Sequence, residues 1–374
     1  MAGIYIHIPF CKQACHYCDF HFSTNQRNRK LICEAIAKEI TLQTRYLKNE
    51  PIETIYLGGG TPSLLTLEEL EIIFTALYSN FIVSKQAEIT LEANPDDLTK
   101  EKLKILKEAT INRLSIGIQS FQDETLKFFN RAHNQKEAVE CISLAREAGF
   151  SNISIDLIYA VPGQENSQWK KDVEQAIALQ PEHLSAYALT IEEKTAFGKW
   201  QKTGRIKPIE ETKAVADFEL LMDTLAGAGY EHYEISNFCL KGYHSKHNSS
   251  YWRQQNYLGV GPSAHSYNGG TRQHNIGNNH LYLKSLAEGK VPYEMEVLTR
   301  ENQINEYNFT TLRTQWGCDL DYLAKHLNYS LLDSVVLQQL LNQQLLTLED
   351  SIIRLTRRGK LLADQVAVDL FVSN

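Results

Sequence analysis

The sequence predicts an α/β protein: a partial (βα)6 barrel with a C-terminal, mainly helical, winged-helix-like domain. Six short runs of β-branched and aromatic residues occur before residue 190, and such runs are typical of strands. Between them lie segments whose apolar residues recur at helical spacing. This alternation favours a parallel sheet over an all-α or all-β fold. A doubly wound open sheet is the alternative, because periodicity does not separate it from a barrel.

The expected strands are apolar along most of their length, as parallel strands buried on both faces are. They cover residues 3–8, 52–57, 87–91, 113–118, 152–157 and 183–189. The expected helices cover residues 30–46, 67–78, 99–109, 135–148 and 167–179. Thr66 precedes the second helix and Glu69 follows three positions later, which predicts a capping box at its start.

We expect three parts along the chain. Residues 1–200 form the partial barrel. Residues 201–299 form an extension rich in aromatic residues and histidine, in which the strand–helix alternation fades. Residues 300–374 are more polar and helical, with two short apolar runs at 345–348 and 352–355 that suit the hairpin of a winged helix.

Composition narrows the function classes. The 374 residues are 43% apolar and 22% charged, as in ordinary globular proteins. No run of 18 apolar residues occurs and the N-terminus shows no secretory signal, so we expect a cytoplasmic protein without a transmembrane segment. Peripheral contact with a membrane stays open. The net charge of −7 argues against specific nucleic-acid binding, which normally requires a basic excess.

Three of the seven cysteines, Cys11, Cys15 and Cys18, have the spacing C-x3-C-x2-C directly after the first strand. The carboxyl ends of parallel barrel strands are where such folds place their chemistry. A [4Fe–4S] cluster held by three thiolates leaves one iron open to a small molecule. The alternative is a zinc site completed by His16 or His21, although no second C-x2-C pair follows.

Polar and glycine-rich positions follow the other strands. Residues Gly58 to Thr61 follow the second strand, where missing Cβ atoms let the backbone approach a ligand; the Lys-Ser/Thr of a P-loop is absent. Glu92 ends the third strand and can accept two hydrogen bonds from a ribose diol. Arg131 can bind a carboxylate and Asp156 an ammonium group. Taken singly, Gln119, Arg131 and Asp156 more often make a structural contact such as an ion pair than bind a ligand.

Taken together, these motifs resemble the radical SAM superfamily, with Tyr17 as the aromatic residue before the last cysteine. Within it they are similar to the branch related to oxygen-independent coproporphyrinogen oxidase. The motifs are YIHIPFC, YCDF, LGGGTPS, ANP, RLSIGIQS, IDLIYAVPGQ and YEISNF, and they span most of the first 270 residues. The resemblance implies a [4Fe–4S] cluster on the three cysteines and S-adenosylmethionine (SAM) bound against it.

The same resemblance implies roles for individual residues. Backbone oxygens of the loop at Gly58, Gly59 and Gly60 would bind the amino group of SAM. The residues implied around a first SAM are Tyr5, Gly59 and Glu92. The residues implied around a second SAM are Gly60, Thr61, Gln119, Arg131 and Asp156.

Two families of this branch compete: the porphyrinogen oxidase itself and the HemW family of haem chaperones. The oxidase typically has C-G-C where this chain has Cys18-Asp19-Phe20, and an N-terminal extension precedes its cluster strand, which here begins almost at residue 1. Residues 247–252, HNSSYW, match the HNxxYW motif of HemW-like proteins. All three features favour HemW. Ala160 stands where the family usually has glycine, and we expect little effect beyond a lost backbone option.

The resemblance therefore implies a protein that binds haem and delivers it to haem-accepting proteins. His247 is the predicted haem ligand, since neutral imidazole is a common axial ligand; His244 competes with it, and a core role for the motif is the third alternative. Radical decarboxylation of coproporphyrinogen and iron–sulfur electron transfer are the competing functions. The motifs indicate binding of a cluster and SAM, and leave catalytic turnover open.

Overall fold

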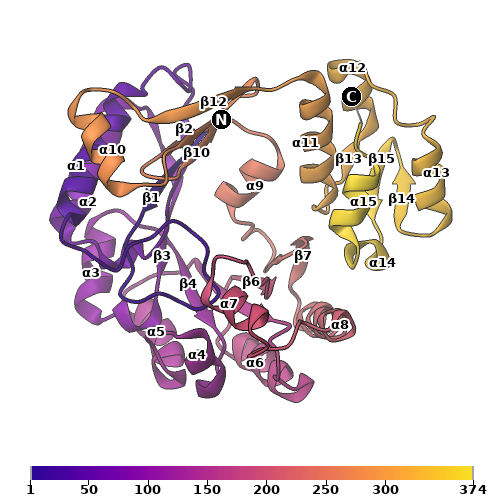
Figure 1. Cartoon of the computed structure of the whole chain (residues 1–374), viewed down its shortest axis with the longest axis horizontal. Coiled ribbons are helices and arrows are strands. Elements are labelled where there is room, and N and C mark those ends of the chain that lie inside the picture. The colour runs from indigo at the N-terminus through magenta and orange to yellow at the C-terminus, as the bar shows by residue number, and fades with distance from the viewer. Residues whose placement is uncertain (1, 373–374) are drawn as a thin grey trace.

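The computed structural model describes residues 2–372 and contains a 12-stranded curved sheet with helices on its outer side, beside a smaller domain (Figure 1). The strand order is β12-β11-β10-β9-β1-β2-β3-β4-β5-β6-β8-β7. No helix among residues 2–372 is long and apolar enough to cross a bilayer.

The first six strands are parallel neighbours in chain order, which confirms the predicted partial (βα)6 barrel. They are β1 (Ala2–Ile8), β2 (Ile52–Gly59), β3 (Val83–Ala93), β4 (Arg113–Gln119), β5 (Ile153–Tyr159) and β6 (His183–Ala188). Their helices are α1 (Arg29–Leu42), α2 (Leu67–Asn80), α3 (Lys100–Glu108), α4 (Asp123–Phe129), α5 (Gln135–Glu147) and α6 (Asn166–Ala178). The capping box of Thr66 and Glu69 starts α2 as predicted, with both reciprocal hydrogen bonds present.

The segment between the barrel and the smaller domain adds strands to both edges of the same sheet. On one side, β7 (Glu231–Glu234) and β8 (Asn237–Cys239) continue from β6. On the other, β9 (Tyr257–Val260) pairs in parallel with β1, and β10 (His265–Tyr267), β11 (Thr271–Asn275) and β12 (Tyr293–Val297) follow it. These strands have three to five residues each. Short strands of this kind carry too little periodicity to be detected in the sequence.

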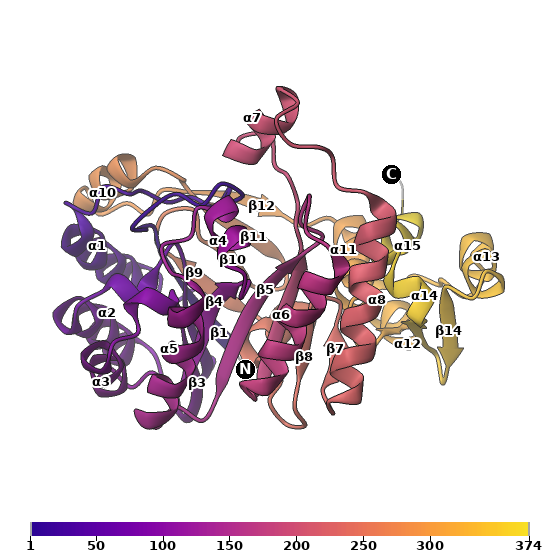
Figure 2. The same cartoon turned by 90° about the horizontal axis from the view of Figure 1, so that it is seen from below.

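Four helices lie between β6 and the smaller domain. They are α7 (Ala196–Lys202), α8 (Glu211–Gly227), α9 (Lys246–Trp252) and α10 (Asn279–Ala287). Helix α7 projects beyond the sheet (Figure 2), and the backbone N–H of Phe197 donates to the carbonyl of His16 in the cysteine loop. Helix α9 lies between the sheet and the smaller domain (Figure 1), where it contacts β1, β2 and α11 (Arg300–Leu312).

The smaller domain is mainly helical and contains the predicted hairpin, and its observed order is a helix, a strand, two helices, the hairpin and two further helices. After α11 come β13 (Cys318–Asp319), α12 (Leu320–Leu327), α13 (Val335–Asn342), β14 (Leu346–Glu349), β15 (Ile352–Leu355), α14 (Arg357–Lys360) and α15 (Ala363–Asp369). It has its own apolar core, separate from that of the barrel. Arg313 joins it to the large sheet, since its Nε lies 3.1 Å from the buried carboxylate of Glu234.

Ala160, directly after β5, has a φ of +59°. An L-residue in this left-handed region costs roughly 1–2 kcal/mol that glycine avoids. This is the lost backbone option that the sequence indicates: the backbone keeps the conformation that glycine favours, although alanine occupies the position.

Candidate functional site

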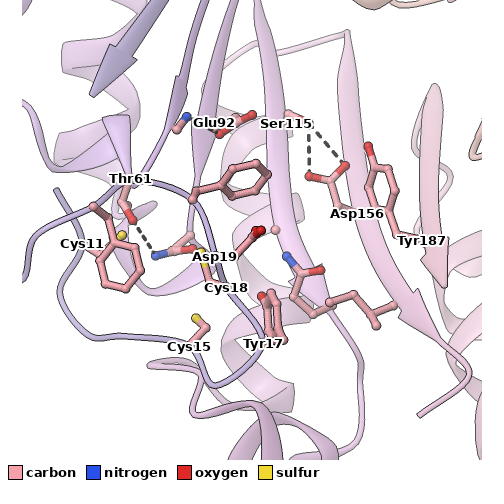
Figure 3. Close-up of a pocket in the computed structure, with 18 of the residues that line it drawn as sticks. Cys11, Cys15, Tyr17, Cys18, Asp19, Thr61, Glu92, Ser115, Asp156 and Tyr187 are labelled. Atoms are coloured by element: carbon pink, nitrogen blue, oxygen red, sulfur yellow. Dashed lines mark hydrogen bonds between the residues drawn. The ribbon is translucent and has the colours of Figure 1, made fainter. Parts of the chain in front are cut away.

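A cavity of about 510 Å³ opens at the carboxyl ends of the barrel strands (Figure 3). Most of the predicted site residues line it, and they come from widely separated positions in the chain. The predicted residues that line it are Cys11, Cys15, Tyr17, Cys18, Gly59, Gly60, Thr61, Glu92, Gln119, Arg131 and Asp156. Tyr5, Gly58 and His247 are the predicted residues that do not.

The three cysteines lie on the loop after β1, on one side of the cavity (Figure 3). Backbone hydrogen bonds shape this loop: the N–H of Cys11 donates to the carbonyl of Ser23, and that of Cys18 to the carbonyl of Cys15. All three side chains are half-buried, and among residues 2–372 no disulfide involves them. Burial raises the pKa of Cys18 to about 12, so the thiol is neutral without a metal.

The loop fits an iron–sulfur cluster with an open iron. Three thiols face one cavity, and no fourth cysteine lines it in the part of the chain that the structure describes. The zinc alternative fits less well, because its histidines are engaged elsewhere. His16 Nδ1 lies 2.9 Å from the carbonyl oxygen of Phe128, and His21 Nε2 lies 2.7 Å from Asn279 Oδ1.

The glycine loop at the end of β2 packs tightly against the cysteine loop. A Cβ on Gly60 would lie 2.6 Å from the carbonyl oxygen of Phe10, and Gly59 has a φ of +104°. Both positions therefore require glycine, and the backbone next to the cysteines stays accessible. Gly58 has a different effect: a Cβ there would lie 3.0 Å from a carboxylate oxygen of Glu92, so this glycine leaves room for that side chain.

Glu92 points into the cavity from the end of β3. Its Oε1 accepts a hydrogen bond from the Tyr56 hydroxyl at 2.8 Å, and its Oε2 accepts one from the Gly59 N–H at 3.1 Å. Each carboxylate oxygen has a second lone pair, so capacity for a ribose diol remains. Burial raises the pKa of Glu92 to about 7. Tyr5 stacks on Tyr56, with ring centroids 6.1 Å apart, behind the cavity wall.

Arg131 connects the cysteine loop with the strand ends. Its guanidinium donates to Asn94 Oδ1 and to the carbonyl of Gly117, both at 2.6 Å, and lies 3.5 Å from Cys15 Sγ. Its buried Nε has no hydrogen-bond partner among the described residues. An unsatisfied buried donor of this kind suits a further acceptor such as a ligand carboxylate. Sequence reasoning assigned no role to Asn94, although it lies within the ANP motif.

The opposite side of the cavity carries Asp156 and Tyr187 (Figure 3). Ser115 donates to Asp156 at 3.3 Å, and burial raises the pKa of this carboxyl to about 6. Ser185 is the β6 partner of Asp156 in the sheet register. Ser115, Ser185 and Tyr187 were missed; the available signal was a polar residue at an inward position of an apolar strand. Gln119, with a φ of +67°, ends β4 at the cavity.

His247 is fully buried, with 0% of its surface exposed. Its Nδ1 lies 2.8 Å from the Thr54 hydroxyl and its Nε2 lies 2.7 Å from the Tyr251 hydroxyl. Both ring nitrogens therefore have hydrogen-bond partners in this conformation, and haem ligation by His247 stays a prediction that requires one of these bonds to break. The next residue of the same motif, Asn248, does line the cavity and was not predicted.

Comparisons with known proteins show the family and the fold. Residues 5–176 match the family model of the radical SAM superfamily, and residues 298–362 match that of the HemN C-terminal domain. A protein named heme chaperone HemW from Bacillus subtilis (strain 168) is 38% identical over 372 residues, which cover 98% of each chain. The Escherichia coli (strain K12) protein of that name is 36% identical over 266 residues, 70% of this chain and 69% of that protein. Coproporphyrinogen III oxidase (HemN) from Escherichia coli, a radical SAM enzyme, shares the fold: the TM-score is 0.86 at 22% identity, covering 99% of this chain and 90% of that one.

Proposed function

Since this chain belongs to the HemW family within the radical SAM superfamily, we propose that it is a haem chaperone. It binds haem together with a [4Fe–4S] cluster and SAM, and it delivers the haem to acceptor proteins. The observation that supports this proposal most directly is the similarity of 38% identity along 98% of the chain to a heme chaperone, combined with three thiols at one cavity.

Cys11, Cys15 and Cys18 would hold the cluster, and the iron without a protein ligand would bind the amino and carboxylate groups of SAM. When bound and reduced, such a cluster supplies the electron that cleaves the sulfonium C–S bond of SAM. The protein contributes orientation: the loop at Gly59 presents backbone to the amino group, and Glu92 accepts hydrogen bonds from the ribose. Thr61 closes this side by accepting a hydrogen bond from Asn94 at 3.3 Å.

The cavity also carries polar residues suited to a second ligand. Gln119, Arg131 and Asp156 line it, and the family resemblance implies a second SAM around these residues and the Gly60–Thr61 turn. Equilibrium dialysis with labelled SAM measures this directly. Two equivalents per chain support the second molecule, and one equivalent excludes it.

Phe20 favours a chaperone over an oxidase. It lines the cavity directly after the cysteine loop and is 68% exposed. The oxidase pattern has a further cysteine at this position. An exposed aromatic side chain at the mouth of a cavity is suited to contact with an apolar macrocycle or a partner surface.

Haem titration of the anaerobically reconstituted protein tests the proposal. A stoichiometric complex with a Soret band, followed by transfer of the haem to an added apo-haem protein, is the expected result. Failure to bind haem would remove the chaperone function. Release of protoporphyrinogen from coproporphyrinogen in the presence of SAM and reductant would establish the oxidase instead, and a cluster whose spectrum ignores SAM would indicate an electron carrier.

A further inference from the structure

We propose that Glu231, Cys239 and His244 form a second metal site, for a divalent ion of the zinc type, at the edge of the large sheet. One oxygen, one sulfur and one nitrogen of these side chains all lie within 4.8 Å of one another. None of the three lines the cavity of the cysteine loop, so this site is independent of the proposed function.

The sheet register places two of the three ligands. Glu231 on β7 is the antiparallel partner of Cys239 on β8, so their side chains leave the same face of the sheet. The chain then turns at Gly242, which has a φ of +87°, and the N–H of Tyr243 donates to the carbonyl of Leu240. This turn brings His244 back over the strand pair.

Neighbouring residues fix the histidine ring. Tyr233 lies edge-on to it with ring centroids 4.7 Å apart, and Trp316 lies 5.8 Å away. Gln315 of the smaller domain reaches His244 Nε2 at 3.2 Å with its side-chain amide. A rotated amide would present its oxygen at the same place, because the two ends of the group are nearly isosteric. Gln315 is thus positioned to supply a fourth ligand.

The separation of the histidine nitrogen and the carboxylate oxygen suits tetrahedral coordination, and all three ligand atoms lie within 4.8 Å of one another. Zinc bonds of roughly 2.0–2.3 Å at tetrahedral angles separate ligand atoms by roughly 3.3–3.6 Å. His244 Nε2 and Glu231 Oε2 are already 3.6 Å apart. Thiolate, imidazole and carboxylate together favour Zn²⁺ over Mg²⁺ or Ca²⁺, which prefer oxygen ligands only. On binding, Cys239 releases its thiol proton to water, so the thiolate and the carboxylate balance the charge of the ion.

The alternative is an ordinary polar contact between Glu231 and His244 beside a buried thiol. Their side chains are 39% and 28% exposed, which also gives an ion a path to the site, whereas Cys239 is 0% exposed. A metal here would tie β7 and β8 to the turn that leads into α9, next to the smaller domain. It would stabilise the arrangement of these two parts of the molecule.

Cobalt(II) binding to the full-length chain tests the site. Cys11, Cys15 and Cys18 are replaced by serine to remove competing thiols, and Co²⁺ is added without oxygen. We expect one equivalent to bind with a thiolate-to-cobalt charge-transfer band, which Zn²⁺ displaces. Cys239→Ser should abolish the band, and Cys33→Ser, at a buried cysteine of α1, should leave it unchanged.

His244→Gln keeps the test decisive if Cys239→Ser folds poorly, because His244 is partly exposed. This variant should weaken cobalt binding at least roughly 100-fold, since loss of even an outer partner costs 10–100-fold. In the cluster-loaded wild type, elemental analysis should find one zinc per chain besides the cluster iron. Cobalt binding without a charge-transfer band, or equal affinity in His244→Gln, would overturn the proposal.

Discussion

The cysteine loop and helix α9 carry the two motifs that the sequence singles out most clearly, and the structure treats them in opposite ways. The loop leaves Cys11, Cys15 and Cys18 half-exposed at the cavity with no disulfide. In α9, His247 is fully buried and both of its ring nitrogens have hydrogen-bond partners. One motif keeps bonding capacity for a ligand, and the other has used its capacity inside the protein.

Residue type and spacing therefore indicate which ligand a motif could bind. Whether the folded protein offers a site there depends on the exposure of the side chains and on hydrogen-bonding or ligating atoms that still have no partner. The same criterion applies inside the cavity. Arg131 keeps a buried Nε without a partner, and the oxygens of Glu92 keep free lone pairs. A ligand gains most from groups that the folded protein has left incompletely satisfied.

The largest effect is expected at the cysteine loop. Cys15→Ser removes one of three thiolates, and the reconstituted protein should lose its [4Fe–4S] cluster, measured as iron and inorganic sulfide per chain. Cys33→Ser is the matched control: this buried cysteine of α1 lies outside the cavity, so the cluster content should equal that of the wild type. A full cluster in Cys15→Ser would remove the loop from the site.

The second-largest effect is expected at His247 in α9. His247→Ala leaves the hydroxyls of Thr54 and Tyr251 without their partner and empties the space of a buried ring. The free energy of unfolding should fall by roughly 2–4 kcal/mol in urea denaturation. Haem binding by the folded variant should persist. His244→Ala is the control, with a loss below roughly 1 kcal/mol in metal-free protein because the side chain is partly exposed.

Loss of the Soret complex in a folded His247→Ala protein would contradict the view that the bonding capacity of His247 is used inside the protein. It would mean that α9 opens to release the imidazole and that the motif binds haem in another conformation. The same loss in His244→Ala, with His247→Ala unaffected, would assign the haem to the sheet edge instead.

The barrel could be predicted from the sequence because each of its strands is a local apolar run followed by a helix. The edge strands could not be predicted. Strand β9 forms because it pairs with β1, and the paired residues Gly3 and Tyr257 lie far apart in the sequence. Such pairing depends on tertiary contacts rather than on local propensity. The domain boundary expected at residue 200 divides the chain by composition, whereas the sheet runs on through β7 to β12.

The site was predictable where a residue type implies its chemistry, as for the cysteines, Glu92 and Arg131. Ser115 and Ser185 escaped notice because serine is common in strands and only the register shows that they face Asp156. The burial and the two hydrogen bonds of His247 could not be predicted, because a motif names a side chain without naming its hydrogen-bond partners.

Glu92 and Glu39 allow the effect of burial to be separated from the effect of ligand binding. Burial raises the pKa of each to about 7, but of the two only Glu92 lines the cavity. Glu39 accepts hydrogen bonds from Gly261, Asn275 and Tyr282. A folded pKa above the unfolded value of 4.5 means that the folded state holds the proton more tightly. The contribution of Glu39 to stability is therefore complete below pH 4.5 and is lost as the pH rises to about 7.

Glu39→Gln should therefore gain stability relative to the wild type by up to roughly 3 kcal/mol between pH 4.5 and 8. Urea denaturation across this range measures the difference.

Glu92→Gln should show the same trend and also bind SAM roughly tenfold more weakly, because it loses a charged hydrogen-bond acceptor. Equal SAM affinity in both variants would contradict a role for Glu92 in the site.

The smallest effect is expected at Ala160, where the φ of +59° strains the backbone. Ala160→Gly relieves roughly 1–2 kcal/mol of left-handed strain and loses roughly 0.5–1 kcal/mol to the greater freedom of the unfolded chain. The free energy of unfolding should rise by roughly 0.5–1 kcal/mol. Ala35→Gly, within α1, is the control and should lower it by roughly 1 kcal/mol. Destabilisation in both variants would mean that the buried methyl group of Ala160 stabilises the fold more than its backbone strain destabilises it.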